Sequence, residues 1–502
     1  MLFNSYIFVL FFFPVCIIGY FTLNHFRKYL LGQAFLVGMS LWFYGYFNLS
    51  YLWIMLFSIL LNFSAYRLLN RTVSPLSRKL ILFLAIALNL GILFYFKYFD
   101  FFLENINAIF RAGFSLQHIL LPLGISFFTF QQLSFVIDAY RGEVSDYSFL
   151  YYVSFVTYFP QLIAGPIVTH DELIPQFLDL KKKQFNWDHF AEGIYLFVMG
   201  LSKKVLLADV FGNAANWGFS NISALDSTNA LLTVLAYTIQ IYFDFSGYCD
   251  MAVGIGRMMN LELPVNFNSP YKSLTILEFW ERWHITLTRF FTKYIYIPLG
   301  GSRKGAWRTY RNVMIVFLIS GLWHGASYTF ILWGALHGLF SVLTRWKRGF
   351  FEKLHPALNW IITFSFINVT WIFFRADSIH DALRILKRIC NLDFQRISTA
   401  ISSCFDPFFL RELCSHIPGL GFLNEQPGCN WFLAAYFLLA FLLILGPRNL
   451  HQRMKVNISN VSTITLPPRG VCTISQLLLT AVFLVLCIFS FSSVSTFLYF
   501  NF

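Results

Sequence analysis

The chain has 502 residues, of which 57% are hydrophobic, 20% aromatic and only 12% charged, and its mean hydropathy is +0.61. This composition excludes a soluble globular enzyme and predicts an all-α polytopic membrane protein. The net charge of +13 is compatible with nucleic-acid binding, but the basic residues fall in short stretches between apolar runs, as in the cytoplasmic loops of membrane proteins. We therefore expect contact with membrane lipid and no nucleic-acid partner.

Apolar runs long enough to cross or enter a bilayer recur along the chain, and they predict about ten to twelve transmembrane or re-entrant helices around a central cavity. The first run has no basic segment before it and no small-residue cleavage site after it, so we expect an uncleaved span. No repeat or long linker separates a soluble domain, and 1–502 is expected to form a single membrane domain. The runs lie at 3–23, 32–47, 49–66, 80–99, 119–137, 149–168, 190–207, 229–247, 312–343, 359–374, 430–446 and 473–492.

Basic residues between the runs predict the orientation in the membrane. Arg27 and Lys28 follow the first run and place the N-terminus outside, whereas the basic segment 447–455 lies inside. The last run then carries the C-terminal residues outside. Segment 376–428 is also expected outside, although its own basic residues count against this. Four cysteines lie in or directly after this segment, and either a disulfide or free thiols are possible; they are Cys390, Cys404, Cys414 and Cys429.

A carboxylate interrupts the run at 229–247. Asp244 should face a cavity or a partner rather than lipid, because a charge at membrane depth is costly. Two interpretations carry equal weight. Asp244 orients a histidine or a substrate hydroxyl, or it forms a structural ion pair, for example with Arg257.

A polar segment at 266–271 precedes a charged and aromatic one at 278–286. If the second is helical, Glu278 and Arg282 can pair while Trp280 and His284 share another face, as in an amphipathic helix at the membrane interface. The cations there and just beyond suit a phosphorylated donor from the cytoplasm, with plain interfacial anchoring as the alternative. The candidate donor-binding residues are Arg282, Arg289, Lys293, Arg303 and Lys304.

No charged residue lies between Arg311 and Arg345, and His324 sits within this stretch. A single helix would be roughly 50 Å long, which is too long for one crossing of about 30 Å, and the stretch is too short for two full crossings. A broken or re-entrant hairpin is therefore expected, with Gly321 and Gly325 permitting the break and His324 near its deep end in an internal cavity. A titratable group at that depth indicates function, and the alternative is a histidine that hydrogen-bonds between helices.

Segments spread over nearly the whole chain resemble the membrane-bound O-acyltransferase family, and within it the bacterial branch of alginate and peptidoglycan O-acetyltransferases and the teichoic-acid D-alanyl transferase. The aromatic end Phe-Leu-Tyr-Phe-Asn-Phe at 497–502 is similar to that of the acetyltransferase members, which favours acetyl over D-alanyl transfer. The other matching segments are 121–131, 159–167, 242–250, 266–271, 282–286, 296–301 and 321–326.

The resemblance implies roles for individual residues, with 240–345 as the catalytic core. His324 would be the central catalytic histidine and His284 the second functional one, and Tyr499 would be an acyl relay or else a terminal interfacial anchor. The supporting residues would be Asp244, Trp323 and Asn268.

The expected reaction follows from these roles. His324 would deprotonate a hydroxyl that attacks the thioester of cytoplasmic acetyl-CoA, while His284 positions the donor or stabilises developing charge. Acetyl-CoA is a substrate here, and neither a bound cofactor nor a metal is expected. The acetyl group would pass through a periplasmic transferase to an alginate- or peptidoglycan-type polysaccharide, which places the protein in a bacterial inner membrane. D-alanyl transfer, a proton-coupled transporter and a structural scaffold are the alternatives.

Overall fold

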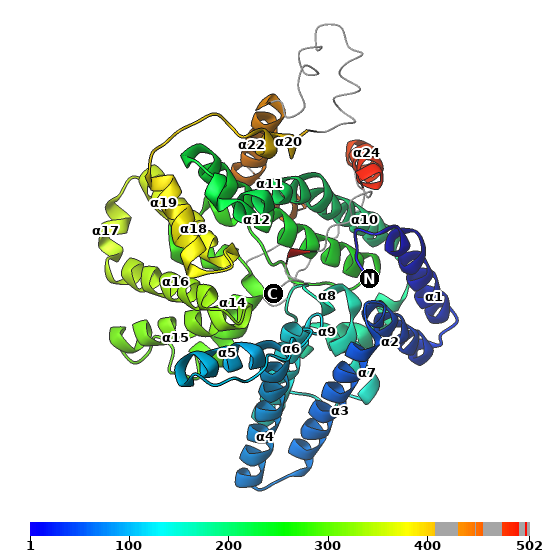
Figure 1. Ribbon diagram of the computed structural model, residues 1–502. Helices are drawn as coiled ribbons and strands as arrows, with labels where there is room; N and C mark the ends of the chain where they lie inside the picture. Colours follow the sequence, from blue (N-terminus) through cyan, green and yellow to red (C-terminus); the bar gives the residue numbers. More distant parts are fainter. Residues whose placement is uncertain (407–429, 447, 455–473, 491–496, 499–502) are drawn as a thin grey trace. The chain divides into compact units, whose positions relative to one another are not determined.

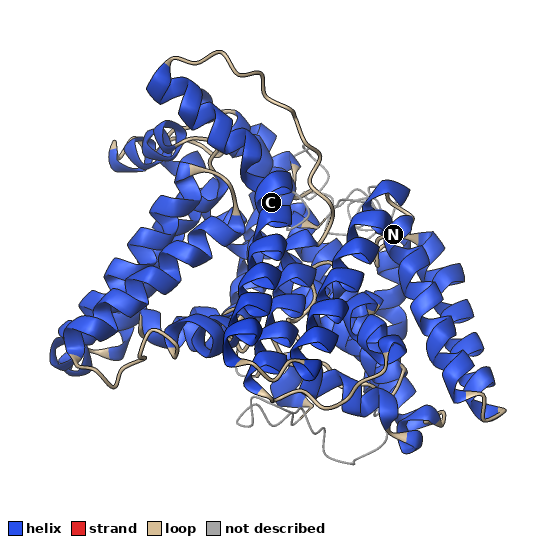
Figure 2. Ribbon diagram, turned by 90° about the horizontal axis from the view of Figure 1, so that it is seen from below, coloured by secondary structure: helices blue, strands red, loops and turns tan. Residues whose placement is uncertain are grey.

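The computed structural model describes residues 1–406, 430–446, 448–454, 474–490 and 497–498. Within these ranges the regular elements are helices, and the one β-type pairing is an isolated antiparallel bridge between Phe267 and Trp283 (Figure 2). The predicted all-α class is therefore confirmed, while the central cavity stays a prediction. Tyr499, Cys414 and Cys429 lie outside the described residues.

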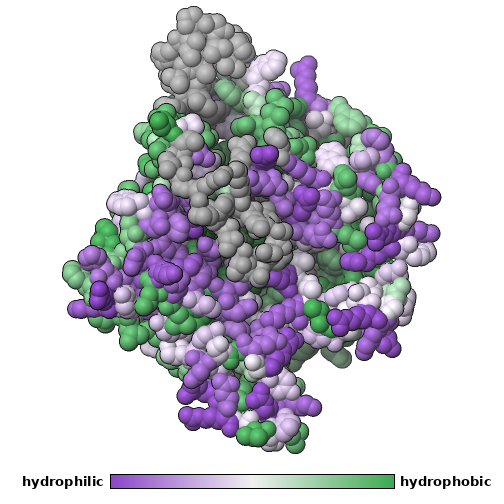
Figure 3. Space-filling view, turned by 180° about the vertical axis from the view of Figure 1, so that it is seen from behind, coloured by the Kyte–Doolittle hydropathy of each residue, from purple (hydrophilic) through white to green (hydrophobic). Residues whose placement is uncertain are grey.

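Among the described residues, five helices are long and apolar enough to cross a bilayer, which supports a multi-pass membrane protein. Apolar residues, drawn in green in Figure 3, reach the surface at many points. On two of these helices Trp53 is 72% and Phe83 is 66% exposed, as expected of side chains that face lipid. The five helices span Phe8–His25, Leu49–Arg71, Pro75–Phe110, Ser227–Met258 and Pro356–Arg375.

The chain divides into two compact units. Unit 1 contains Met1–Leu201, Tyr248–Val265 and Met454–Phe502, and unit 2 contains Ser202–Gly247 and Asn266–Arg453. The long helix α12 (Ser227–Met258) contributes residues to both.

Buried amides hold three helices of unit 1 together. Asn62 of α3, Asn89 of α4 and Gln132 of α6 exchange hydrogen bonds of 2.7–3.0 Å, and α3 and α4 lie side by side in Figure 1. Such polar contacts stabilise helix pairs where lipid removes the usual hydrophobic driving force. The helices of unit 1 besides α12 are α1 (Phe13–His25), α2 (Tyr29–Gly45), α3 (Leu49–Arg71), α4 (Pro75–Leu93), α5 (Phe99–Phe110), α6 (Ile125–Arg141), α7 (Phe149–Thr157), α8 (Phe159–Leu162), α9 (His170–Leu178), α10 (Trp187–Ser202) and α24 (Ile474–Phe489).

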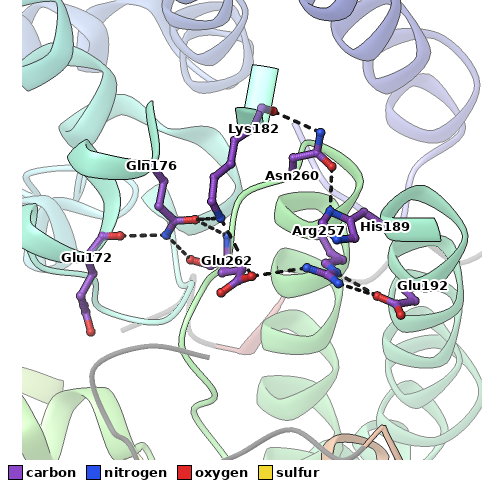
Figure 4. Close-up of polar contacts among 8 residues, drawn as sticks. All are labelled: Glu172, Gln176, Lys182, His189, Glu192, Arg257, Asn260 and Glu262. Atoms are coloured by element: carbon purple, nitrogen blue, oxygen red, sulfur yellow. Dashed lines mark hydrogen bonds and ion pairs between the residues drawn. The ribbon is translucent and has the colours of Figure 1, made fainter. Parts of the chain in front are cut away.

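A network of charged and amide side chains fixes the C-terminal end of α12 within unit 1 (Figure 4). Arg257 donates to Glu192 Oε2 from two nitrogens at 2.8 and 2.9 Å, and its third nitrogen lies 3.4 Å from Glu262 Oε1. The side-chain oxygen of Asn260 lies 2.9 Å from His189 Nδ1. Because each charge here has a charged or amide partner, we interpret the network as structural.

Unit 2 is built around a helical hairpin of α15 (Ala306–His324) and α16 (Tyr328–Trp346), which packs against α18 (Pro356–Arg375; Figure 1). The predicted break after His324 is confirmed, because Gly325 ends α15 in an extended conformation. The other helices of unit 2 are α11 (Asp209–Ser220), α13 (Ile276–Arg282), α14 (Ile285–Phe291), α17 (Arg348–Lys353), α19 (Ile379–Cys390), α20 (Thr399–Ser403), α22 (Asn430–Leu445) and α23 (Leu450–Arg453).

Two details of the hairpin differ from the sequence-based expectation. Each arm has 19 residues, or about 28 Å, because the helices continue through Arg311 and Arg345 instead of stopping at these charges. Gly321 does not permit the break, because it lies inside α15. A Cβ atom there would come within 2.4 Å of the Phe330 carbonyl oxygen, so Gly321 permits the two arms to touch.

Candidate active site

His284 lies in a tight polar segment of unit 2. The backbone N–H of Asn268 donates to the Arg282 carbonyl at 2.9 Å, and that of Ile285 donates to the Asn266 carbonyl at 3.0 Å. Between these bonds His284 adopts a left-handed conformation with φ 46° and ψ 52° and precedes α14. A non-glycine residue in this region costs about 1–3 kcal/mol, and such strain persists where the surroundings enforce it, as at functional sites.

The helix expected through 278–286 ends earlier than predicted. Its first part is confirmed, since Arg282 and Glu278 form an ion pair of 2.7 Å. Helix α13 stops at Arg282, however, and the left-handed residue that follows turns the chain. Trp280 and His284 therefore do not share one helical face, and that prediction was wrong.

The imidazole of His284 is buried and held by one asparagine. His284 Nδ1 lies 3.2 Å from Asn266 Oδ1, which also accepts from the backbone N–H and the hydroxyl of Thr286 at 3.2 and 3.0 Å. Burial lowers the pKa of His284 to about 3, so the ring is neutral at physiological pH. Asn266 was not among the predicted site residues, although it lies in the same motif as Asn268.

His324 is the last residue of α15 and is also buried, with 4% of its surface exposed. Its ring centroid lies 4.9 Å from that of Trp323 and 5.1 Å from those of Trp333 and Phe374. The Trp323 ring also lies 6.2 Å from the ring of His284. The structure therefore brings the two predicted histidines near each other, because both of their rings lie next to the ring of Trp323.

Asp244 takes part in a buried ion pair. Its Oδ1 lies 2.6 Å from Lys204 Nζ, which lies 2.8 Å from an oxygen of Asp209. Asp244 thus forms an ion pair, but Arg257 was the wrong partner, because that residue pairs with Glu192 and Glu262. Whether Asp244 also orients a histidine or a substrate hydroxyl stays a prediction. Spacing along the chain could not indicate Lys204, which precedes Asp244 by 40 residues.

Asn268 anchors the polar segment to the start of α23. Its side-chain oxygen accepts from Asn449 Nδ2 and Gln452 Nε2, each at 2.9 Å. These contacts tie Asn268 to residues 449–452, whereas His284 is hydrogen-bonded to Asn266. The role of Asn268 in the reaction stays a prediction.

The predicted donor-binding cations lie in different surroundings. Arg303 and Lys304 are exposed in the loop before α15, whereas Arg289 and Lys293 are only partly exposed. Lys293 Nζ lies 5.2 Å from the centre of the Tyr294 ring. Arg282 is engaged with Glu278. Arg303 and Lys304 are therefore the two of this set most accessible to a ligand.

Within the described ranges no group of three or more His, Cys, Asp or Glu side chains could hold a metal ion. Cys390 and Cys404 are free thiols there.

Comparison with known proteins identifies a family. The family model of MBOAT, the membrane-bound O-acyltransferase family, matches residues 113–378, which include both histidines of the site. The peptidoglycan O-acetyltransferase of Helicobacter pylori is 44% identical over 423 residues, covering 78% of this chain and 80% of that protein.

Two further relatives are named for other polymers, alginate and teichoic acid. The probable alginate O-acetylase AlgI of Pseudomonas aeruginosa is 37% identical over 409 residues, with 79% of this chain and 76% of AlgI covered. The teichoic acid D-alanyltransferase of Bacillus subtilis is 26% identical over 280 residues, covering 51% of this chain and 69% of the relative. These matches favour a transferase over the transporter and scaffold alternatives.

Proposed function

This chain belongs to the membrane-bound O-acyltransferase family, and we propose that it moves an acetyl group from cytoplasmic acetyl-CoA toward hydroxyl groups of a cell-envelope polysaccharide. The observation that carries the proposal is the pair of buried histidines whose rings both lie next to the Trp323 ring. An imidazole shielded from bulk water is suited to proton transfer at an acyl-transfer centre.

The choice of acetyl group and polysaccharide rests on similarity. Relatives named for O-acetylation of peptidoglycan and alginate are 44% and 37% identical to this chain, whereas the named D-alanyltransferase is 26% identical over a shorter stretch. This ranking supports acetyl transfer over D-alanyl transfer. The same relatives support a peptidoglycan- or alginate-type acceptor.

In the proposed reaction His324 takes the proton of an accepting hydroxyl as its oxygen attacks the thioester carbonyl. A carbon–oxygen bond forms, the carbon–sulfur bond breaks, and the proton held by His324 passes to the leaving thiolate. Neither oxidant nor metal is needed to balance this step. Trp323, Trp333 and Phe374 surround the imidazole and exclude water that would otherwise hydrolyse the thioester.

The donor would enter from the basic loop before α15. Arg303 and Lys304 lie just before α15, which begins at Ala306 and ends at His324. The axis of this helix is roughly 27 Å long from Ala306 to His324. Guanidinium and ammonium groups bind phosphates well. Coenzyme A carries its phosphates and its thioester at opposite ends of a flexible arm, so its phosphates would bind at the basic loop while the thioester reaches toward the other end of α15.

Tyr499 is proposed as an acyl relay between the donor and the outer side of the membrane. In the same aromatic segment Phe497 is 1% exposed and packs edge-on against Tyr248 of α12, with ring centroids 4.7 Å apart. Burial of Phe497, two residues before Tyr499, supports the relay over the interfacial anchor. A separate periplasmic transferase would then receive the acetyl group, and the protein would reside in a bacterial inner membrane.

The proposal is tested by offering acetyl-CoA to the purified chain in nanodiscs and measuring release of free coenzyme A thiol. We expect release above the rate with empty nanodiscs, and radiolabelled acetyl that stays on the native chain but not on Tyr499→Phe. A D-alanyl-loaded carrier protein is the competing donor. Thiol release from that carrier and none from acetyl-CoA would overturn the assignment of the acetyl group.

A further inference from the structure

One side-chain oxygen holds three hydrogen-bond donors of the site segment. Asn266 Oδ1 lies 3.2 Å from His284 Nδ1, 3.2 Å from the Thr286 backbone nitrogen and 3.0 Å from the Thr286 hydroxyl oxygen. All three residues are buried. The asparagine is therefore placed to decide how the His284 ring is oriented and protonated.

The backbone N–H of Thr286 settles which end of the amide faces the histidine. An N–H group can only donate, so the amide atom beside it must be the oxygen, and an exchanged oxygen and nitrogen would set two donors against each other. A carbonyl oxygen cannot donate either. His284 Nδ1 must consequently carry a hydrogen.

We propose that Asn266 is a positioning residue that holds His284 as the neutral tautomer with hydrogen on Nδ1, so that Nε2 acts as a hydrogen-bond acceptor for the substrate. This inference rests on the proposed function and deepens it. A neutral imidazole of this tautomer has a lone pair at Nε2 and accepts from an N–H or O–H group. It cannot donate from Nε2 to an oxyanion, so His284 orients a substrate group rather than stabilising negative charge.

The same unit contains a histidine of the opposite tautomer, which serves as an internal reference. Trp280 Nε1 lies 3.3 Å from Nδ1 of the fully buried His337. Because an indole N–H only donates, His337 Nδ1 must accept and the hydrogen of the neutral ring lies on Nε2. Two buried histidines of one unit are thus expected to differ in protonation site.

Nitrogen-15 magnetic resonance of the full chain in nanodiscs, with labelled histidine, tests the assignment directly. Spectra of His284→Gln and His337→Gln identify the two resonance pairs by their loss. We expect the protonated nitrogen of His284 to be Nδ1 and that of His337 to be Nε2. A hydrogen on Nε2 of His284, or a doubly protonated ring at neutral pH, would overturn the inference without any reference to the donor.

The pH dependence of acetyl-CoA cleavage by the Asn266→Asp variant provides a second test. A carboxylate beside the ring favours the imidazolium form and raises the pKa of His284, and the imidazolium has no lone pair at Nε2. Acetyl-CoA cleavage by Asn266→Asp should therefore be lost at low pH and return as the pH rises through the raised pKa, a limb absent from the native profile. A profile identical to the native one would contradict the inference.

Asn266→Ala removes the acceptor altogether, and we expect kcat/KM to fall about tenfold or more. Asn62→Ala is the matched control, because Asn62 is equally buried and hydrogen-bonded but lies in unit 1. Equal activity in these two variants would overturn the positioning role. Native protein that does not cleave acetyl-CoA would refute the donor assignment, whereas the tautomer measurement would still stand.

Discussion

Trp323 is the residue on which the geometry of the site depends, because its ring contacts both histidines. It is 5% exposed, so its removal would leave a cavity next to their rings. Truncation of a buried tryptophan to alanine costs about 3–5 kcal/mol, and the neighbouring rings would lose their fixed orientation.

Trp323→Ala should therefore abolish acetyl-CoA cleavage and lower the thermal unfolding midpoint, whereas Trp323→Phe should retain most of both. Thiol release and unfolding in detergent are measured on the two variants in parallel. A native cleavage rate in Trp323→Ala would show that the ring does not organise the histidines.

Lys204 neutralises two carboxylates in the interior of unit 2. Lys204→Met removes this ammonium group from Asp244 and Asp209, and breaking a buried pair by removing one partner costs about 3–5 kcal/mol. We expect a clear drop in the unfolding midpoint, with partial recovery when Asp244→Asn is added. If the double variant is no more stable than Lys204→Met, the carboxylates are not coupled through this lysine.

At the residue scale the motifs identified His284, Trp323 and His324 but not their partners. Asn266 lies 18 residues before His284, and only the backbone bonds of the polar segment bring the two side chains together. The spacing of residues along a helix also gives no sign that His284 has a left-handed backbone conformation. The predicted helix therefore continued past Arg282, where the observed helix ends.

The α15–α16 hairpin is the element that carries His324, and its arms touch through glycines. A Cβ atom on Gly321 would meet the Phe330 carbonyl oxygen at 2.4 Å, and one on Gly334 would meet the Phe317 carbonyl oxygen at the same distance. Neither carbonyl can yield without moving its helix.

Gly321→Ala should consequently push the arms apart and reduce acetyl-CoA cleavage by at least about tenfold, an effect of roughly 1.4 kcal/mol or more on the transition state. Gly38→Ala is the matched control, because nothing lies within 4 Å of the added methyl group in α2. The rate of thiol release from acetyl-CoA is measured for both variants and compared with the native rate. Equal rates would mean that close contact of the arms is not required.

Sequence patterns predicted the existence and break of this hairpin better than its length. The absence of charges between Arg311 and Arg345 was taken as the limit of the helices, but both arms extend through these arginines. Arginine is a good helix former, and its long side chain reaches polar surroundings from a helix end, so a charge does not mark where a helix stops.

For the whole molecule, the distribution of positive charge predicts where the donor binds. Replacing both Arg303 and Lys304 by alanine should raise KM for acetyl-CoA about tenfold with little change in kcat, because these exposed side chains would contact only the donor's phosphates. Arg348→Ala, on the exposed α17, serves as the control. The effect should shrink as salt is added. An unchanged KM would move the donor site elsewhere.

Composition was sufficient to predict the fold class and the membrane, and the motifs were sufficient to predict the family. The inside and outside assignment of each loop stays a prediction, as does the interpretation of 1–502 as one functional domain with its catalytic core at 240–345.

The most direct test is single-turnover transfer from radiolabelled acetyl-CoA by the purified chain in nanodiscs, compared with His324→Ala. We predict that the native chain cleaves the donor and that His324→Ala loses at least about a hundredfold in rate while keeping the native unfolding midpoint within a few degrees. Cleavage at the native rate by folded His324→Ala would contradict the central role of this histidine.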